Sequence, residues 1–163
     1  MINIEKEIWR KNKILRTLSK KIKEFEMNKY VKVWKEMIKY IKNPKNWWIW
    51  LSAPQIWINV RLIVVSLPKS RNDKNYDTVI MINPEILEYS SEKEIWEEWC
   101  LSIPWKRWDV ERSKYIRLIY ENEKWNLINA TFNDLQARIV QHEIDHLNWI
   151  LFIDRLISNK FVK

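Results

Sequence analysis

Residues 141–146 read QHEIDH, and this stretch contains both histidines of the 163-residue chain. His142 and His146 are one helical turn apart, so their side chains project from the same helix face, about 5–6 Å apart at Cβ. Two imidazoles at this spacing can bind one metal ion, and Glu143 is placed to take a proton from a water beside that ion. The alternative is a surface helix that carries two histidines by chance.

The residues around this motif predict the helix that carries it. Thr131 lies three residues before Asp134, a spacing that favours a helix start at Thr131. Leu135, Ile139 and His142 then recur at helical spacing, which predicts that this helix face packs in a core. We expect the helix to end at residues 147–149, LNW, where glycine is the usual stop residue.

The rest of the chain predicts one more helix and several strands. Residues 24–42 place apolar side chains at helical spacing between lysines, and this helix should end near Pro44. Strands are expected at 61–67 and 78–82, joined by a polar loop at 68–77, and on either side of a turn at 123–126 within 114–132. The expected fold is a single α+β domain over residues 1–163, with mixed or antiparallel strands packed around the C-terminal helix.

A catalytic metal site with two histidines needs a third protein ligand and leaves a position for water. Cys100 is the only cysteine of the chain, which also excludes an internal disulfide bond. Its alternative role is that of a buried core thiol, the usual environment of a lone free cysteine. The residues by themselves leave these two roles open, and a Cys-His₂ ligand set with water would suggest zinc.

Composition and charge narrow the function classes. The net charge is +8 and the sequence pI is near 9.5, which raises the question of an RNA partner. Much of the excess is dispersed lysines in the first 46 residues, and a solvated helix face explains these better. We find no RNA-binding motif, no apolar run long enough for a membrane span and no signal-peptide core. We therefore expect a cytoplasmic protein that binds neither membrane nor DNA.

Glycine is absent from the chain, whereas tryptophan occurs 12 times. Average glycine usage is roughly 7%, and turns need the positive φ that glycine adopts at little cost. The stretch at 46–57, NWWIWLSAPQIW, shows the anomaly most clearly. The number of tryptophans is close to the number of missing glycines, which raises the question of whether they occupy glycine positions.

Three separated segments together resemble the signature of the peptide deformylase family. They are WIWLSAPQ at 48–55, EEWCLS at 97–102 and QHEIDH at 141–146. In that family the segments read G-φ-G-L-[AS]-A-x-Q, where φ is apolar, E-G-C-L-S and Q-H-E-x-D-H. Their order and approximate spacing also match, and the resemblance runs from about residue 13 to residue 156. It implies a metal-dependent hydrolase that removes the N-formyl group from the N-terminal methionine of new proteins and releases formate.

The resemblance also implies roles for individual residues. Cys100, His142 and His146 would bind one ion per chain, usually Fe²⁺, with Zn²⁺ or Ni²⁺ as substitutes. Glu143 would be the general base, while the side-chain amide of Gln55 and the backbone N–H of Leu101 would stabilise the oxyanion. The expected walls of the methionine pocket are Ile49, Trp50, Leu135 and Ile139, although each could equally be a core residue. An ion pair between Glu98 and Arg112 and an orienting role for Asp145 are expected behind the ligands.

The resemblance implies that the protein acts on the N-formyl-methionyl nascent peptide. The ribosome is a further expected partner, through the basic surface. Two alternatives remain open: a zinc peptidase that uses the H-E-x-x-H motif, and a catalytically inactive deformylase-like protein. The second would follow if the tryptophans are real, because rings at 48 and 50 would crowd the active-site loop.

Our hypothesis is that many of the tryptophans are UGA codons that the source genome reads as glycine. Eight stand at family glycines or in turns where glycine is expected: Trp48, Trp50, Trp57, Trp99, Trp105, Trp108, Trp125 and Trp149. The remaining four, Trp9, Trp34, Trp47 and Trp96, are not assigned by this argument.

Overall fold

The computed structural model of the protein describes residues 13–46, 50–68 and 76–156. Trp9, Trp47, Trp48 and Ile49, which the sequence analysis singles out, lie outside these ranges. The elements run in the order η1 (Glu24–Glu26), α1 (Met27–Ile41), β1 (Trp50–Ser52), η2 (Ala53–Ile56), β2 (Leu62–Pro68), β3 (Tyr76–Tyr89), β4 (Lys93–Cys100), β5 (Ile103–Ser113), β6 (Tyr115–Glu121), β7 (Leu127–Asn133), α2 (Asp134–Leu147) and η3 (Phe152–Arg155). This α+β architecture confirms the predicted fold class.

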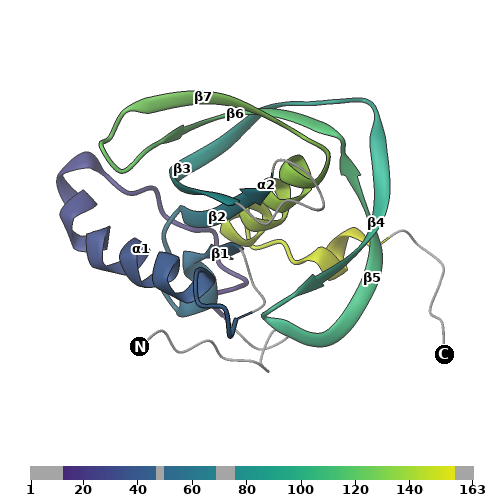
Figure 1. The fold of residues 1–163 in the computed structure, drawn as a ribbon, viewed down its shortest axis with the longest axis horizontal. Helices are drawn as coiled ribbons and strands as arrows, with labels where there is room; N and C mark the ends of the chain where they lie inside the picture. Colours follow the sequence, from purple (N-terminus) through teal and green to yellow (C-terminus); the bar gives the residue numbers. More distant parts are fainter. Residues whose placement is uncertain (1–12, 47–49, 69–75, 157–163) are drawn as a thin grey trace.

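The strands form two antiparallel sheets that enclose α2 (Figure 1). The larger sheet has the order β1-β2-β3-β6-β7, and the smaller one consists of β4 and β5. Helix α2 contacts β1, β2, β6 and β7 on one side and β5 on the other. The helix that carries the QHEIDH motif is therefore the centre of the molecule. No helix among the described residues is long and apolar enough to cross a membrane.

Strand β2 separates two apolar cores, which explains why its sequence is apolar except for Ser66. Ile63, Val65 and Leu67 face the core around α2, whereas Leu62 and Val64 face the core under α1. Successive side chains of a strand point to opposite faces, so a strand covered on both sides carries apolar residues on both faces. Helix α1 supplies the cover on the second face through Trp34, Met37 and Ile41, all of them buried.

The predicted elements are confirmed with changes at their ends. The helix expected at 24–42 consists of η1 followed by α1, and the hairpin about residues 123–126 consists of β6 and β7. The prediction that α2 starts at Thr131 is wrong. Strand β7 continues to Asn133, which pairs with Tyr115, and the helix begins only at Asp134. Strands β4 and β5 were not predicted.

Candidate metal centre and active site

Helix α2 places a run of polar side chains in the interior of the protein. Every residue from Ala137 to Leu147 is buried, including Gln141, His142, Glu143, Asp145 and His146. Buried polar and charged groups destabilise a fold unless hydrogen bonds or counter-charges compensate them. Each of these side chains must therefore have a partner that the rest of the fold supplies, or a ligand.

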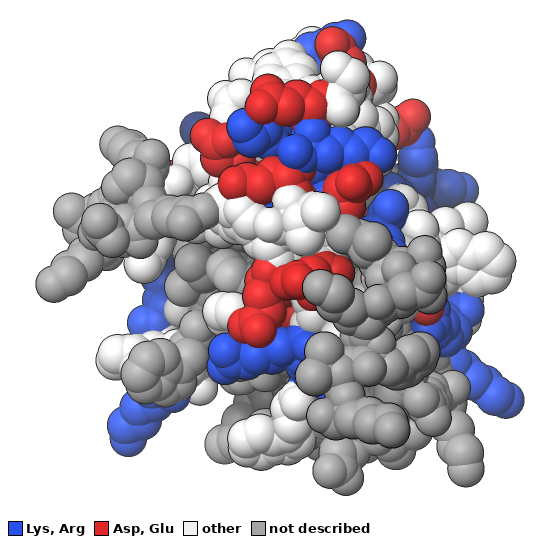
Figure 2. All heavy atoms as spheres, turned by 90° about the vertical axis from the view of Figure 1, so that its right-hand side faces the viewer, with Lys and Arg blue, Asp and Glu red and all other residues white. Residues whose placement is uncertain are grey.

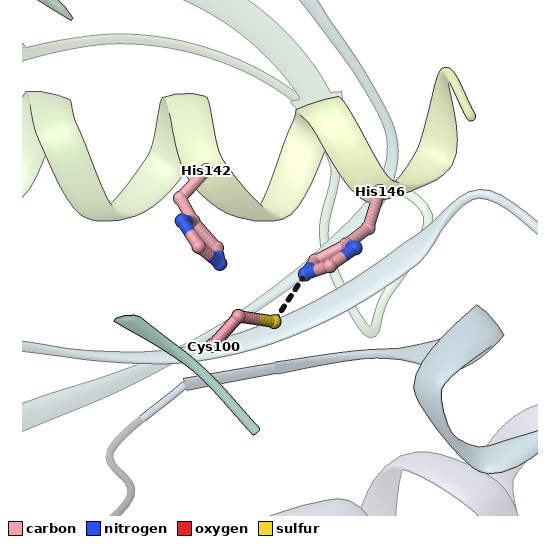
Figure 3. Close-up of side chains that lie close together, drawn as sticks. All are labelled: Cys100, His142 and His146. Atoms are coloured by element: carbon pink, nitrogen blue, oxygen red, sulfur yellow. Dashed lines mark hydrogen bonds between the residues drawn. The ribbon is translucent and has the colours of Figure 1, made fainter. Parts of the chain in front are cut away.

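Cys100 lies beside the two histidines, at the end of β4 (Figure 3). Its Sγ is 3.2 Å from Nε2 of His146, and the two imidazole ring centroids are 5.0 Å apart. The three candidate ligand atoms lie within 4.8 Å of one another. The structure thus brings together the three residues that the sequence analysis proposed as ligands. Cys100 is buried, as the core-thiol reading required, but its sulfur faces the imidazoles.

Several side-chain atoms at this site are buried without a hydrogen-bond partner. They are Nε2 of His142 and both carboxylate oxygens of Glu143. Nδ1 of His146 is also unpaired, but it lies on the side of its ring away from Cys100 (Figure 3). Orphaned buried polar atoms are rare in native proteins, and where they cluster they indicate the place of a water or an ion. Burial raises the pKa of Glu143 to about 7, which is suitable for a group that exchanges a proton near neutral pH. The thiol, imidazole and carboxyl groups present therefore fit a divalent metal ion with an adjacent water.

Glu98 fixes the orientation of His142. Its carboxylate accepts hydrogen bonds from Arg112 Nε at 2.9 Å and Nη2 at 3.0 Å, and from Arg138 Nη1 at 2.6 Å. Nδ1 of His142 lies 3.0 Å from the same carboxylate. Burial would raise the pKa of Glu98, but hydrogen bonds from His142 and Arg112 hold it well below its usual value. The ionised carboxylate makes Nδ1 the protonated nitrogen, which leaves the lone pair on Nε2 for a metal.

A second layer of ion pairs connects this site to the C-terminal segment. Arg112 also pairs with Asp145, which accepts hydrogen bonds from Arg155 Nε at 2.5 Å and Nη2 at 2.6 Å. The structure thus contains the expected Glu98–Arg112 pair and gives Asp145 an anchoring partner. The sequence analysis missed Arg138 and Arg155, because no local pattern shows which distant carboxylate an arginine will meet.

The amide of Gln55 is held with its donor end toward the candidate metal centre. Its Oε1 accepts hydrogen bonds from the Ser52 backbone N–H at 2.8 Å and from Ser52 Oγ at 2.9 Å. Its Nε2 is therefore free to face Cys100 Sγ, at 3.6 Å. Leu101 follows Cys100 directly and is buried in the core under α1. Both proposed oxyanion donors thus lie at or next to Cys100.

A cavity of about 530 Å³ opens next to His142. Its lining residues are Trp50, Trp96, Glu97, Glu98, Trp99, Leu135, Arg138, Ile139 and His142. Three of the four residues proposed for the substrate pocket are among them, and Ile49 lies outside the described residues. The sequence analysis missed Trp96 and Trp99 as lining residues.

The family model described as Polypeptide deformylase matches residues 6–162 of this chain. The chain belongs to the peptide deformylase family. Among curated peptide deformylases, that of Synechocystis sp. is 37% identical over 145 residues, which cover 89% of this chain and 75% of that protein. The peptide deformylase of Bartonella henselae is 38% identical over 90% of this chain and 81% of its own length. The match to the peptide deformylase of Pseudothermotoga lettingae, at 46% identity, spans 69% of this chain and 61% of that protein.

Solved peptide deformylase structures share the fold. A class I type b peptide deformylase from Acinetobacter baumannii with Met-Ala-Ser bound has a TM-score of 0.83 and 34% identity. That match covers 96% of this chain and all of the other, 100%. The peptide deformylase of Thermotoga maritima has a TM-score of 0.74 at 34% identity and covers 89% of this chain and 92% of its own.

Replacing Arg138 with methionine in this deformylase is expected to lower the free energy of unfolding of the metal-free protein by about 1–3 kcal/mol. The change removes a guanidinium that hydrogen-bonds Glu98, the Val110 carbonyl and, at 2.6 Å, the Glu94 carbonyl in the interior. Urea unfolding of the metal-free protein measures the loss.

Arg107→Met is the matched control, because Arg107 on β5 pairs with Glu97 on β4 and both side chains are exposed. Figure 2 shows acidic and basic side chains interleaved on this face, which carries β4 and β5. An exposed pair contributes about 0–1 kcal/mol, so the control should change stability little. Equal losses in the two variants would contradict a special role for Arg138.

Proposed function

We propose that the protein is a peptide deformylase in activity as well as in family: it removes the formyl group from the N-terminal methionine of new proteins. The observation that carries this proposal is the buried convergence of Cys100, His142 and His146. Beside them Glu143 has two unpaired carboxylate oxygens. The family membership gives this constellation its reaction type, the hydrolysis of a formamide.

We assign the metal to Sγ of Cys100 and to one ring nitrogen from each of His142 and His146. Fe²⁺ is the ion we propose, one per chain, with Zn²⁺ or Ni²⁺ able to replace it. Such an ion, when bound, supplies a fixed positive charge that makes a neighbouring water more acidic and polarises a carbonyl oxygen. The hydrogen bond from Nδ1–H of His142 to Glu98 fixes the tautomer and the orientation of that imidazole, so that Nε2 is the nitrogen available to the metal.

Glu143 is the proton carrier of the reaction. Its carboxylate takes a proton from the water that attacks the formyl carbon. The carbonyl oxygen becomes negatively charged in the tetrahedral intermediate and receives hydrogen bonds from Gln55 Nε2–H and the Leu101 backbone N–H. Glu143 then delivers its proton to the leaving nitrogen. The C–N bond breaks, and the products are formate and a peptide with a free amino terminus.

The cavity beside His142 is where we place the methionine side chain. Trp50, Leu135 and Ile139 give it apolar walls, and an unbranched thioether fits such walls without needing a strong hydrogen bond. The Acinetobacter baumannii relative with Met-Ala-Ser bound supports a peptide that begins with methionine. Because nascent chains carry the formyl group, we place the protein in the cytoplasm, as one domain over residues 1–163 and within reach of the ribosome.

Formate release from formyl-Met-Ala-Ser, measured beside a casein digest, tests the proposal. We expect that formate is released from the peptide and that casein is not cleaved. The reason is that the hydrogen-bond donors around Glu143 stabilise the reaction of a terminal formyl group. A zinc peptidase would cleave casein and release no formate. An inactive deformylase-like protein would do neither, even with its metal bound.

Replacing Cys100 with alanine is expected to reduce the bound metal to well below one ion per chain. The change removes one of three protein ligands and leaves the two imidazoles, which bind a divalent ion more weakly without the thiolate. Elemental analysis after dialysis measures the metal, and formate release should fall in parallel. Full metal content in this variant would contradict the assignment of Cys100. A peptidase that uses only the histidines would also keep its metal.

A further inference from the structure

We infer that positions 57, 105, 125 and 149 are glycine in the protein as its own cells make it, the four codons being UGA triplets read as glycine. The inference concerns the identity of these residues and holds whatever reaction the protein catalyses. It narrows the glycine hypothesis to the tryptophans for which the backbone itself supplies an argument.

The backbone conformation singles out these four tryptophans. Six described residues have positive φ, and four of them are Trp57 at 67°, Trp105 at 66°, Trp125 at 63° and Trp149 at 61°. The other two are Asn83 and Asp134, residue types that tolerate this region. For a bulky side chain a positive φ is a genuine outlier, because Cβ approaches the following carbonyl oxygen. Glycine has no Cβ and adopts the conformation freely.

Two of the positions lie at helix C-termini, in a capping motif that usually contains glycine. At the end of α2, Trp149 N–H bonds the His146 carbonyl at 3.4 Å, and Ile150 N–H bonds the Asp145 carbonyl at 2.9 Å. This pair of bonds defines a Schellman motif, in which the left-handed residue is usually glycine. The same pattern follows η2. There the N–H groups of Trp57 and Ile58 bond the carbonyls of Pro54 at 3.2 Å and Ala53 at 3.1 Å.

The other two positions lie in the β6–β7 hairpin turn and at a register shift of the β4–β5 pair. Trp125 closes the β6–β7 turn with a bond from its N–H to the Asn122 carbonyl at 2.9 Å, and the Asn122 N–H bonds Asn126 at 3.0 Å. A turn followed by a left-handed residue is the three-residue hairpin loop, whose bulge residue is typically glycine. Trp105 lies between Ile103 and Arg107, where the β4–β5 register shifts. Bulges at such shifts also favour glycine.

Burial does not offset the strain at most of these positions. Trp105 is 95% exposed, Trp149 59% and Trp57 41%. Trp34 is the opposite case, because it lies inside α1 with right-handed backbone and is only 4% exposed. The four tryptophans thus have a backbone conformation typical of glycine, and two of them, Trp105 and Trp149, are mostly exposed to solvent. In a chain that has no glycine anywhere, one reassigned codon explains all four.

Peptide mass spectrometry of the protein isolated from the cells that encode it decides the inference. Fragment spectra should show glycine at positions 57, 105, 125 and 149, each lighter than tryptophan by the mass difference between the two residues. The gene should carry UGA at the same four codons. Tryptophan in any of the four fragments overturns the inference for that position, and so does a UGG codon there.

Discussion

Changing Glu143 to glutamine is expected to lower the rate of formate release by about 10²–10⁴-fold, the usual contribution of a general base. Glutamine keeps the shape of the side chain but cannot accept the proton of the attacking water. The metal content should stay unchanged, because the assigned ligands are Cys100 and the two histidines. Steady-state formate release from formyl-Met-Ala-Ser and elemental analysis of the same samples measure the two quantities. The loss should appear in kcat, because Glu143 acts on the reacting groups.

Glu111→Gln is the control for this substitution. Glu111 is an exposed carboxylate on β5 that pairs with Lys93, so its loss removes a negative charge without touching the site. Its rate should equal that of the unchanged protein. If Glu143→Gln retains most of the activity, another group carries the proton and the assignment of the H-E-x-x-H glutamate is wrong. If it loses its metal as well, the carboxylate is needed to hold the ion.

The protein with glycine at 57, 105, 125 and 149 is expected to be more stable than the printed sequence by several kcal/mol. Left-handed backbone costs a residue with a side chain roughly 1–2 kcal/mol, and glycine removes this cost at each position. The four turns are separate, so the gains should add approximately. Position 125 should gain least, because that ring packs partly against the core under α1. Urea unfolding of both chains at equal metal content measures the difference.

Trp34→Gly is the matched control, since it makes the same chemical change at a right-handed, buried position. It should lower the free energy of unfolding by about 3–5 kcal/mol, because it removes a large core side chain. Glycine inside a helix adds about 1 kcal/mol to that loss. A four-glycine chain that is no more stable than the printed one would show that the turns accept tryptophan without strain. The glycine inference would then lose its physical basis.

The candidate site was predictable to the extent that it follows from residues close together in the sequence. The i and i+4 positions of His142 and His146 require only that a helix forms. Local turn chemistry also suggested positions 125 and 149, and the resemblance suggested position 57; all three have positive φ. Position 108 did not follow this expectation, since the described residues with positive φ do not include Trp108. Strands β4 and β5 escaped prediction because charged residues interrupt their apolar pattern, and a two-stranded ribbon buries little of either face.

By itself, the sequence determined the helix that carries QHEIDH, the doubly covered strand β2 and the family to which the chain is similar. These depend on the local repeat of apolar side chains and on motif residues that can be compared directly. Only the tertiary structure decided where the sulfur of Cys100 lies, which is beside the imidazole of His146. It also brought Arg138 and Arg112 to one carboxylate, that of Glu98. Such long-range pairs form where the two sheets close around α2, and periodicity along the chain carries no information about which distant side chains that packing brings together.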